Sequence, residues 1–426
     1  MLDINYIREH PEEVKRGAAK KHFEAPVDEL LDVDRRRREA QRRVEDLRAE
    51  KNRRSKEIPG LAAEERQAAV TAMRQVDKDL KELEPELTRL EKEFDSLMLQ
   101  IPNVPAPDVP EGADDRDNVE LRRWGEPRKF DFEPLDHVAL GEKLDIIDFA
   151  RGSKVGGSRS YYLKNEGALL ETAILRWAMD HLVKKGFVPM DVPMLVKPEA
   201  MFGGGFLPGG EDSVYTVDTG QDLIGTAEVS LVAYHAGEIL DEAELPKHYA
   251  GFSACFRREA GAAGKDTRGL YRVHQFYKIE QVVICRNDDE ESRRQHDLLL
   301  GNSEELVQAL GLPYRVVYVC GGDLGRPQVR KHDLETWMPS RKNYGETHSC
   351  STIHEFQARR SMIRYRDKDG KVRYCHTLNN TALASPRILI PVLENYQQAD
   401  GSVAIPETLR PYMGGQDVIR PKGAKE

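Results

Sequence analysis

Residues 251–283 read GFSACFRREAGAAGKDTRGLYRVHQFYKIEQVV, and this stretch decides our interpretation of the fold. Its pattern predicts two strands, at about Ala250–Arg257 and Arg272–Ile284, joined by a glycine-rich, charged loop. Because side chains alternate between the faces of a strand, one face of the second strand carries polar and aromatic groups. These groups are Arg272, His274, Phe276, Lys278 and Glu280. An aromatic ring between cations and a carboxylate favours a site for a charged ligand with a flat ring over a solvated edge strand.

Length and charge limit the classes of protein to which the chain can belong. With 426 residues it is too long for one simple core, so we expect two or more domains. The formal net charge of -9 argues against indiscriminate nucleic-acid binding, so any such contact requires a local basic patch. The sequence contains neither a signal-peptide pattern nor an apolar run of membrane-spanning length, and we expect a cytoplasmic protein without membrane contact.

The five cysteines are scattered and form no CxxC pair: Cys255, Cys285, Cys320, Cys350 and Cys375. This spacing disfavours a zinc ribbon and a disulfide scaffold, and it fits a reducing compartment. The sequence also lacks GxxxxGK[ST], which excludes a P-loop, and HExxH or any clustered His/Cys ligand set. We therefore expect no zinc.

Two long segments before residue 102 predict an antiparallel helical hairpin. They cover Val27 to about Lys56 and about Ala62 to Ile101, with a helix break at Ile58-Pro59-Gly60. In the second segment apolar residues recur at alternating spacings of three and four, as in a heptad repeat, at Met73, Val76, Leu80, Leu83, Leu87, Leu90, Phe94, Leu97 and Ile101. So short a connection places the two helices side by side as a projecting hairpin.

The first helix of this hairpin is rich in arginine, within a chain that is acidic overall. A solvated coiled-coil face is the ordinary explanation of such a charge run. A basic rod also suits a long polyanion, so nucleic acid and a partner protein both stay open as ligands of the hairpin.

Composition divides the rest of the chain. We predict an N-terminal domain at 1–104, a proline-rich linker at 105–135, a larger domain with strands and helices at 136–415 and a disordered tail at 416–426. Within the larger domain, Gly203-Gly204-Gly205 predicts a mobile loop. Ser385-Pro386 predicts the cap and first position of the last helix.

The stretch FRREAGAAGKDTRGLYRVHQFYKIE, with TAEV upstream and Arg387 before LENY, resembles the bacterial seryl-tRNA synthetases, which are class II aminoacyl-tRNA synthetases. The resemblance covers essentially the whole chain. It implies an α+β fold in which helices flank an antiparallel sheet, an N-terminal coiled-coil arm, and a homodimer assembled partly near Pro193. It also implies ATP-dependent activation of L-serine to seryl-adenylate, followed by transfer of the seryl group to tRNA(Ser) and, where present, tRNA(Sec).

The resemblance assigns the nucleotide site. Arg257, Arg387 and Glu346 take the catalytic positions, with Arg257 on the α-phosphate and Arg387 on the γ-phosphate, and Glu346 and Ser349 take the positions of Mg²⁺ ligands. Phe276 takes the position under the adenine ring and Glu259 the position at its edge. The full set of implied ATP contacts is Arg257, Arg258, Glu259, Arg272, Val273, Phe276, Glu346, Thr347, His348, Ser349 and Arg387.

The resemblance also assigns the serine pocket and the tRNA contacts. The implied serine contacts are Thr226, Ala227, Glu228, Arg257, Glu280 and Thr381, with Glu280 and Thr381 at the side-chain hydroxyl. A pocket that hydrogen-bonds this hydroxyl rejects alanine because its polar groups would be left unpaired. On the hairpin, Arg36, Arg43, Lys51 and Arg54 are the implied tRNA contacts. Arg258, Lys265 and Arg268 are expected to be loop charges near the incoming tRNA end.

Two departures from the family pattern stand out. His348 occupies a position where small or aliphatic residues are usual, and residues 380–386 read NTALASP where Gly-Ser-Gly-Leu-Ala is common. Loss of glycines there is expected to tighten the pocket, with Thr381 keeping the hydroxyl. Alternatives to a housekeeping enzyme are a ligase that loads an amino acid onto a carrier protein and an antibiotic-tolerant paralogue.

Overall fold

The structure is a computed structural model that describes residues 1–262, 264 and 266–421, with the backbone alone for Ala63 and Ala262. It divides into two compact units, Met1–Val104 and Pro105–Glu426, each with hydrophobic core clusters of its own. No helix in the described part of the chain combines the length and the apolar composition that a bilayer-crossing segment needs.

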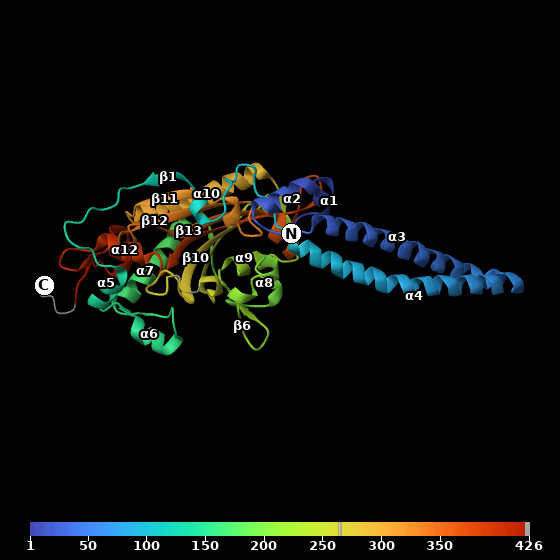
Figure 1. The fold of residues 1–426 in the computed structure, drawn as a ribbon, viewed down its shortest axis with the longest axis horizontal. Helices are drawn as coiled ribbons and strands as arrows, with labels where there is room; N and C mark the ends of the chain where they lie inside the picture. The colour runs from blue at the N-terminus through green and yellow to red at the C-terminus, as the bar shows by residue number, and fades with distance from the viewer. Residues whose placement is uncertain (263, 265, 422–426) are drawn as a thin grey trace. The chain divides into compact units, whose positions relative to one another are not determined.

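The first unit is the helical hairpin with two short helices at its base, α1 (Ile4–Glu9) and α2 (Pro11–Lys20). The long helices α3 (Val27–Glu57) and α4 (Ala63–Gln100) pack against each other and are joined through a 3₁₀ turn at Ile58–Gly60 (Figure 1). Their buried residues include the predicted heptad positions Val76, Leu80, Leu90 and Leu97. The expected hairpin is therefore present, and α4 runs through Pro85 as one helix.

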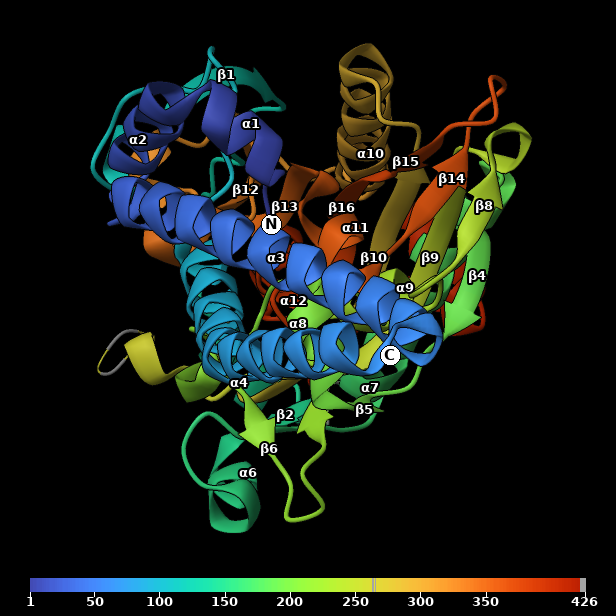
Figure 2. The same cartoon turned by 90° about the vertical axis from the view of Figure 1, so that its right-hand side faces the viewer.

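The centre of the second unit is an eight-stranded sheet in the order β1-β11-β12-β13-β16-β10-β9-β4. In that order the strands are Val119–Trp124, Tyr314–Tyr318, Arg330–Met338, Asn343–His354, His376–Ser385, Gln275–Cys285, Lys247–Phe256 and Val188–Asp191. All neighbours pair antiparallel except β4 with β9, and β4 is the edge strand beside β9 (Figure 2). The chain thus has the expected α+β fold, in which helices flank an antiparallel sheet.

Helices cover this sheet on both faces. On one face α7 (Glu166–Lys184) and α10 (Asp289–Ala309) pack against strands β10 and β16. On the other face α9 (Glu228–Ala233) contacts β9 and β10, while α8 (Pro198–Gly204) and α11 (Glu355–Ser361) pack against α9. The helices α5 (His137–Lys143) and α12 (Leu389–Tyr396) pack together. The remaining helix, α6, consists of residues Phe149–Gly156.

The remaining strands form small sheets: β15-β14-β8 (Val372–Tyr374, Arg364–Arg366, Ile239–Asp241), β5-β7-β6 (Leu195–Val196, Asp222–Leu223, Tyr215–Thr216), β2-β3 (Ile147–Asp148, Tyr162–Leu163) and β17-β18 (Val403–Ala404, Val418–Ile419). The last pair corrects the expected disordered tail at 416–426, because Ile419 is fully buried in the core. Residues 422–426 lie outside the described residues.

Three further expectations differ from the structure. Residues 119–124 of the predicted linker form β1, which joins the sheet through its main chain and therefore needs no apolar side chains. Gly203 and Gly204 end helix α8 instead of forming a mobile loop. Ser385 does not cap a helix: it ends β16, and its hydroxyl donates to Glu171 at 2.8 Å, while α12 begins later, at Leu389.

Candidate active site

The hairpin of β9 and β10 forms the centre of the candidate site, at the stretch with which the sequence analysis began. Arg257 directly follows β9, and its Nε donates to the Gly225 carbonyl at 3.2 Å. Its guanidinium lies 5.2 Å from the centre of the Phe276 ring on β10. The structure thus brings together the cation and the ring that the sequence singled out.

The loop after β9 holds the next predicted residues. Glu259 has φ +53°, and its carboxylate accepts from Arg272 Nη1 at 3.4 Å. Arg272 also donates to Asp266 at 3.3 Å, so this cation is held between two acids. Arg258 is exposed, and its main-chain nitrogen donates to the Ser213 carbonyl.

Arg387 follows β16 and brings a second guanidinium to the site. Its Nε donates to the Tyr271 carbonyl at 3.1 Å, and its Nη1 donates to the Glu346 carbonyl at 3.0 Å. The Glu346 carboxylate lies 3.8 Å from Nη1, and the guanidinium lies 4.4 Å from the Tyr271 ring centre. Strand β13 therefore supplies a carboxylate beside a fixed cation, as the family pattern implies.

Beside Glu346 the neighbouring strand β12 places a buried charge pair that the sequence analysis missed. Asp333 pairs across the ladder with Ser349, and its Oδ2 lies 3.0 Å from Lys331 Nζ. Burial raises the pKa of Asp333 to about 7, against the opposing effect of Lys331. Its Oδ1 is buried and accepts no hydrogen bond from the described residues. Asp333, Glu346 and Ser349 can each offer an oxygen atom as a metal ligand. A buried carboxylate oxygen that accepts no hydrogen bond suits a hard cation such as Mg²⁺.

The predicted serine pocket is assembled from β10, β16 and the segment before α9. Glu280 and Thr381 are direct partners across the β10–β16 ladder. Lys278 on the same face pairs with the Glu280 carboxylate, and it donates to Thr226 Oγ1 at 2.7 Å. All four of these side chains are buried, and they form a polar cluster with one cation and one carboxylate.

A second carboxylate, that of Glu228, lies in the same pocket. Its Oε1 accepts from Gln357 Nε2 at 2.6 Å and from Asn379 Nδ2 at 2.9 Å. Burial, and then the proximity of Glu280, raise the pKa of Glu228 to about 7. The pocket therefore contains a carboxyl group that gains from a cationic ligand, because an opposite charge favours its ionised form.

Five of these residues were not assigned by the sequence analysis: Lys278, Lys331, Asp333, Gln357 and Asn379. Lys278 carried a usable signal, since it lies on the predicted polar face. Gln357 is 129 residues from its partner Glu228, and no local pattern could connect the two.

Four of the predicted contacts have buried side chains. The Thr347 hydroxyl lies 2.7 Å from that of Thr336 and donates to the Leu334 carbonyl. His348 is buried against Thr347, and this burial lowers its pKa to about 4. Val273 and Ala227 are buried and apolar.

The departure at residues 380–386 also has a structural explanation. Asn380 Nδ2 donates to the Leu299 carbonyl at 2.6 Å and to Ser303 Oγ at 2.9 Å, both on α10. Its side chain therefore points to the face of the sheet opposite Glu228 and Asn379. The expected tightening of the pocket by this side chain is wrong, because strand alternation directs it into the α10 interface.

On the hairpin, three of the four predicted tRNA contacts already have acidic partners. Arg36 lies 3.5 Å from Glu86, Lys51 lies 2.6 Å from Asp77, and Arg54 lies 2.5 Å from Glu50. Arg43 is exposed and forms no ion pair within the described residues. Lys265, in the loop expected near the tRNA end, lies outside the described residues.

The arrangement on the sheet face has a definite chemical capacity. Two guanidinium groups are fixed by main-chain carbonyls near an aromatic ring, and a cluster of buried polar side chains lies on the same sheet face. Forked cations stabilise negative charge that develops on a phosphoryl group without any proton transfer. The pocket beside them suits a small zwitterion with a hydroxyl group.

Comparison with known proteins identifies this combination of units. The sequence profile "Seryl-tRNA synthetase N-terminal domain" matches residues 1–105, and the profile "tRNA synthetase class II core domain (G, H, P, S and T)" matches residues 215–396. The chain is 49% identical to a protein named serine–tRNA ligase from Deinococcus radiodurans, over 98% of this chain and 99% of that one. It is 46% identical to the protein of the same name from Dictyoglomus turgidum, over 99% of this chain and 100% of that one.

Solved structures agree with the sequence relatives. The seryl-tRNA synthetase from Pyrococcus horikoshii, complexed with ATP, superposes with a TM-score of 0.93 and 41% identity, over 99% of this chain and 100% of that one. The cytoplasmic serine–tRNA ligase from Naegleria fowleri, in complex with AMP, gives a TM-score of 0.90 and 34% identity, over 99% of each chain.

Proposed function

This chain belongs to the seryl-tRNA synthetases, and from that premise we propose that it activates L-serine with ATP and charges tRNA(Ser). The observation that carries the proposal is the placement of Glu280 and Thr381 as cross-strand partners on the sheet face that also bears Phe276. An amino-acid pocket thereby adjoins a ring and a cation suited to an adenylate.

In the first step the serine carboxylate attacks the α-phosphorus of ATP, and pyrophosphate leaves. We assign Arg257 to hold both the carboxylate and the α-phosphate, which would otherwise repel each other. The contact of Nε with the Gly225 carbonyl leaves the remaining nitrogens of the guanidinium to reach these anions. No general base is needed, since the serine carboxylate is already ionised at neutral pH.

We assign the adenine ring to the space against Phe276, with Glu259 at its edge and Arg387 at the γ-phosphate. Stacking on an aromatic ring and a guanidinium is a common way to bind a base. The carbonyls of Tyr271 and Glu346 hold the Arg387 guanidinium in place before the nucleotide arrives.

Mg²⁺ would be held by Glu346 and Ser349, where it would neutralise charge on the phosphates. Asp333, the cross-strand partner of Ser349, adds a further carboxylate beside this set. The chain's own contribution is to fix the Glu346 main chain through Arg387 and to keep a carboxylate oriented toward Ser349.

Serine selection is assigned to the polar pocket. Glu280 and Thr381 would take the side-chain hydroxyl, and Glu228 with Thr226 would lie by the ammonium group. Lys278 would balance the charge of Glu280, so that the pocket holds the zwitterion without an excess of negative charge. Alanine would leave buried polar groups unpaired, and the methyl of threonine would collide with the pocket wall.

The hairpin is assigned to tRNA(Ser), with tRNA(Sec) as a further substrate where it exists. Contact with duplex RNA through shape and phosphates suits an elongated helical rod.

A homodimer is proposed through the region of Pro193; the edge strand β4 with its 52% exposed Val188 supports this surface. We also place the enzyme in the cytoplasm, with its substrates.

A panel assay of the full-length protein tests the proposal. Pyrophosphate exchange with serine, alanine, threonine and glycine is expected to respond to serine alone, and charging is expected with tRNA(Ser). Absence of serine-dependent exchange would contradict the proposal. Serine activation without tRNA charging would favour a carrier-protein ligase, and normal activity with resistance to seryl-adenylate analogues would indicate the antibiotic-tolerant paralogue.

A further inference from the structure

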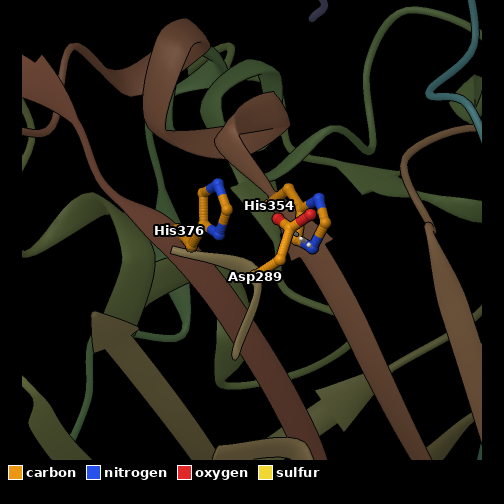
Figure 3. A group of neighbouring side chains, drawn as sticks. All are labelled: Asp289, His354 and His376. Carbon is orange, nitrogen blue, oxygen red and sulfur yellow. Dashed lines mark ion pairs between the residues drawn. The ribbon is translucent and has the colours of Figure 1, made fainter. Parts of the chain in front are cut away.

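Two histidines and an aspartate gather on the sheet away from the candidate active site. They are His354 at the end of β13, His376 at the start of β16 and Asp289 at the start of α10 (Figure 3). One nitrogen or oxygen atom from each lies within 4.8 Å of the others. His376 is five residues before Thr381 on the same strand, which separates the cluster from the serine pocket by about 17 Å.

The backbone at His354 is unusual in a way that positions its side chain. The β13–β16 ladder shifts register between Thr352 and His354. His354 then takes a positive φ of 53°, a conformation that is uncommon for a residue with a side chain. Bulges of this kind redirect side chains, and strained positions concentrate at functional sites. Here the bulge places the His354 ring beside that of His376, with 4.3 Å between the ring centres.

A neighbouring side chain orients His376. Its Nδ1 lies 2.7 Å from the hydroxyl of Ser292, on the first turns of α10. This contact occupies one ring nitrogen and leaves Nε2 as the available ligand atom, as is usual for histidines that bind metals. His354 Nε2 lies 3.8 Å from Asp289 Oδ1, so the carboxylate is already beside the second ring.

Two of the three side chains of the cluster reach the surface. The His354 side chain is 27% exposed and that of Asp289 is 76% exposed. Asp289 adds a negative charge that is exposed to solvent, through which an ion can enter.

We propose that His354, His376 and Asp289 bind a divalent transition-metal ion of the Zn²⁺ type, with solvent completing the coordination. Imidazole and carboxylate are the ligands that such ions prefer, at about 2.0–2.2 Å. This inference does not rest on the proposed function, and it differs from the expectation of no zinc, which came from the absence of clustered ligands in the sequence.

Binding requires a defined movement. The two rings are stacked 13° from parallel, and a shared ion must lie close to the plane of both rings. His354 therefore turns out of the stack, toward Asp289. Its side chain is 27% exposed, so the ring has room at the surface to do so. Bound metal would join the ends of β13 and β16 to the start of α10, which stabilises the sheet by linkage without touching the reacting atoms.

The test titrates the untagged, full-length protein with Zn²⁺ by calorimetry, in buffer without ATP or chelators. We expect one Zn²⁺ per chain and a rise in the melting temperature of the metal-free protein. Co²⁺ is a second probe, since its absorption spectrum reports nitrogen and oxygen coordination. Serine activation by the same preparations is expected to be unchanged.

Three variants locate the site. His354→Asn keeps a residue that tolerates positive φ, Asp289→Asn removes an exposed charge, and Ser292→Ala removes the group that orients His376. We expect Ser292→Ala to weaken Zn²⁺ binding by about 10–100-fold and the two ligand variants to weaken it further. His22→Asn is the matched control, because His22 also has a positive φ, of 57°, and lies in the other unit.

Each outcome of these titrations either supports or overturns the proposed metal site. Loss of the stoichiometric site in His354→Asn and Asp289→Asn, with His22→Asn unchanged, supports the proposal. A wild-type protein that binds no Zn²⁺ overturns it. Binding that survives both ligand variants, or that weakens equally in His22→Asn, also overturns it.

Discussion

The helical hairpin and the face of the central sheet both carry many charges, but they hold them in opposite ways. On the hairpin, cations such as Arg36 and Lys51 are in contact with water and pair with acids of the neighbouring helix. On the sheet face, Lys278, Glu280 and Glu228 are buried and depend on a few fixed partners. Exposed pairs contribute little and are screened by salt, whereas removal of one member of a buried pair leaves a charge in a poor environment.

This difference explains how the chain can be acidic and still have a hairpin suited to tRNA. Helix α3 carries eleven Lys or Arg and nine Asp or Glu, so its positive excess is small. Because these charges are solvated, their contacts can be exchanged for phosphate contacts at low cost. The sheet face, by contrast, is organised before its ligand binds. The predictions below test this contrast, from the largest expected effect to the smallest.

Replacement of Lys278 by Met should have the largest effect, because it leaves Glu280 buried without its cation. We expect a loss of about 3–5 kcal/mol in the free energy of unfolding. Urea denaturation measures this loss, and calorimetry with serine measures the accompanying loss of affinity. Lys278→Arg should retain more stability than Lys278→Met; equal stability of wild type and Lys278→Met would contradict the buried pair.

Arg257→Ala tests the cation assigned to the reacting phosphate. Serine-dependent pyrophosphate exchange should fall by about 100–1,000-fold, because a charge-stabilising donor is lost from the transition state. The fold should be retained, since Arg257 is exposed and its side chain makes a single hydrogen bond within the described residues. Arg151→Ala, at an exposed arginine on α6, is the matched control. A similar decrease in both variants would remove the basis for the assignment.

Glu228 gives a prediction about pH. Its pKa is raised from 4.5 to about 7, so between these values the folded protein holds a proton that the unfolded chain has lost. Stability should therefore fall as pH rises through this window, by up to about 3 kcal/mol. Glu228→Gln has no such proton to lose. The stability of the variant relative to wild type, measured as urea midpoints, should therefore increase between about pH 5 and pH 8. A constant difference between the two proteins would show that the pKa of Glu228 is not raised.

The hairpin should give the smallest effects. Arg43→Ala removes an exposed cation without an acidic partner, so tRNA affinity should decrease a few-fold and the salt slope by about 1. Arg36→Ala should weaken binding less, because Glu86 already neutralises Arg36 in part. Serine activation should be unaffected in both. Filter binding at several salt concentrations measures the slopes, and a larger effect of Arg36→Ala would contradict the role of pairing.

The same contrast separates what the sequence could predict from what it could not. The heptad positions of α4 were predictable because residues three and four apart in the sequence lie on one face of a helix. The polar face of β10 followed from strand alternation, and the family resemblance then selected Glu280 and Thr381. The partnership of Lys278 with Thr226 spans 52 residues and depends on how β10 meets the segment before α9.

Register shifts account for further differences. Ladder irregularities at Leu334/Glu335 and Thr352/His354 change which side chains face the site, and nothing in the local sequence marks them. Strand β13 carries Glu346 to the site but buries Thr347 and His348, and at its far end it brings His354 to His376. Alternation alone could predict neither result.

A structure of the protein with a non-hydrolysable seryl-adenylate analogue tests the central claim most directly. The account predicts the phosphate at Arg257, the adenine against Phe276, and the serine hydroxyl within hydrogen-bond distance of Glu280 and Thr381. A serine hydroxyl directed away from both of these residues, or an adenine that does not contact Phe276, would contradict it.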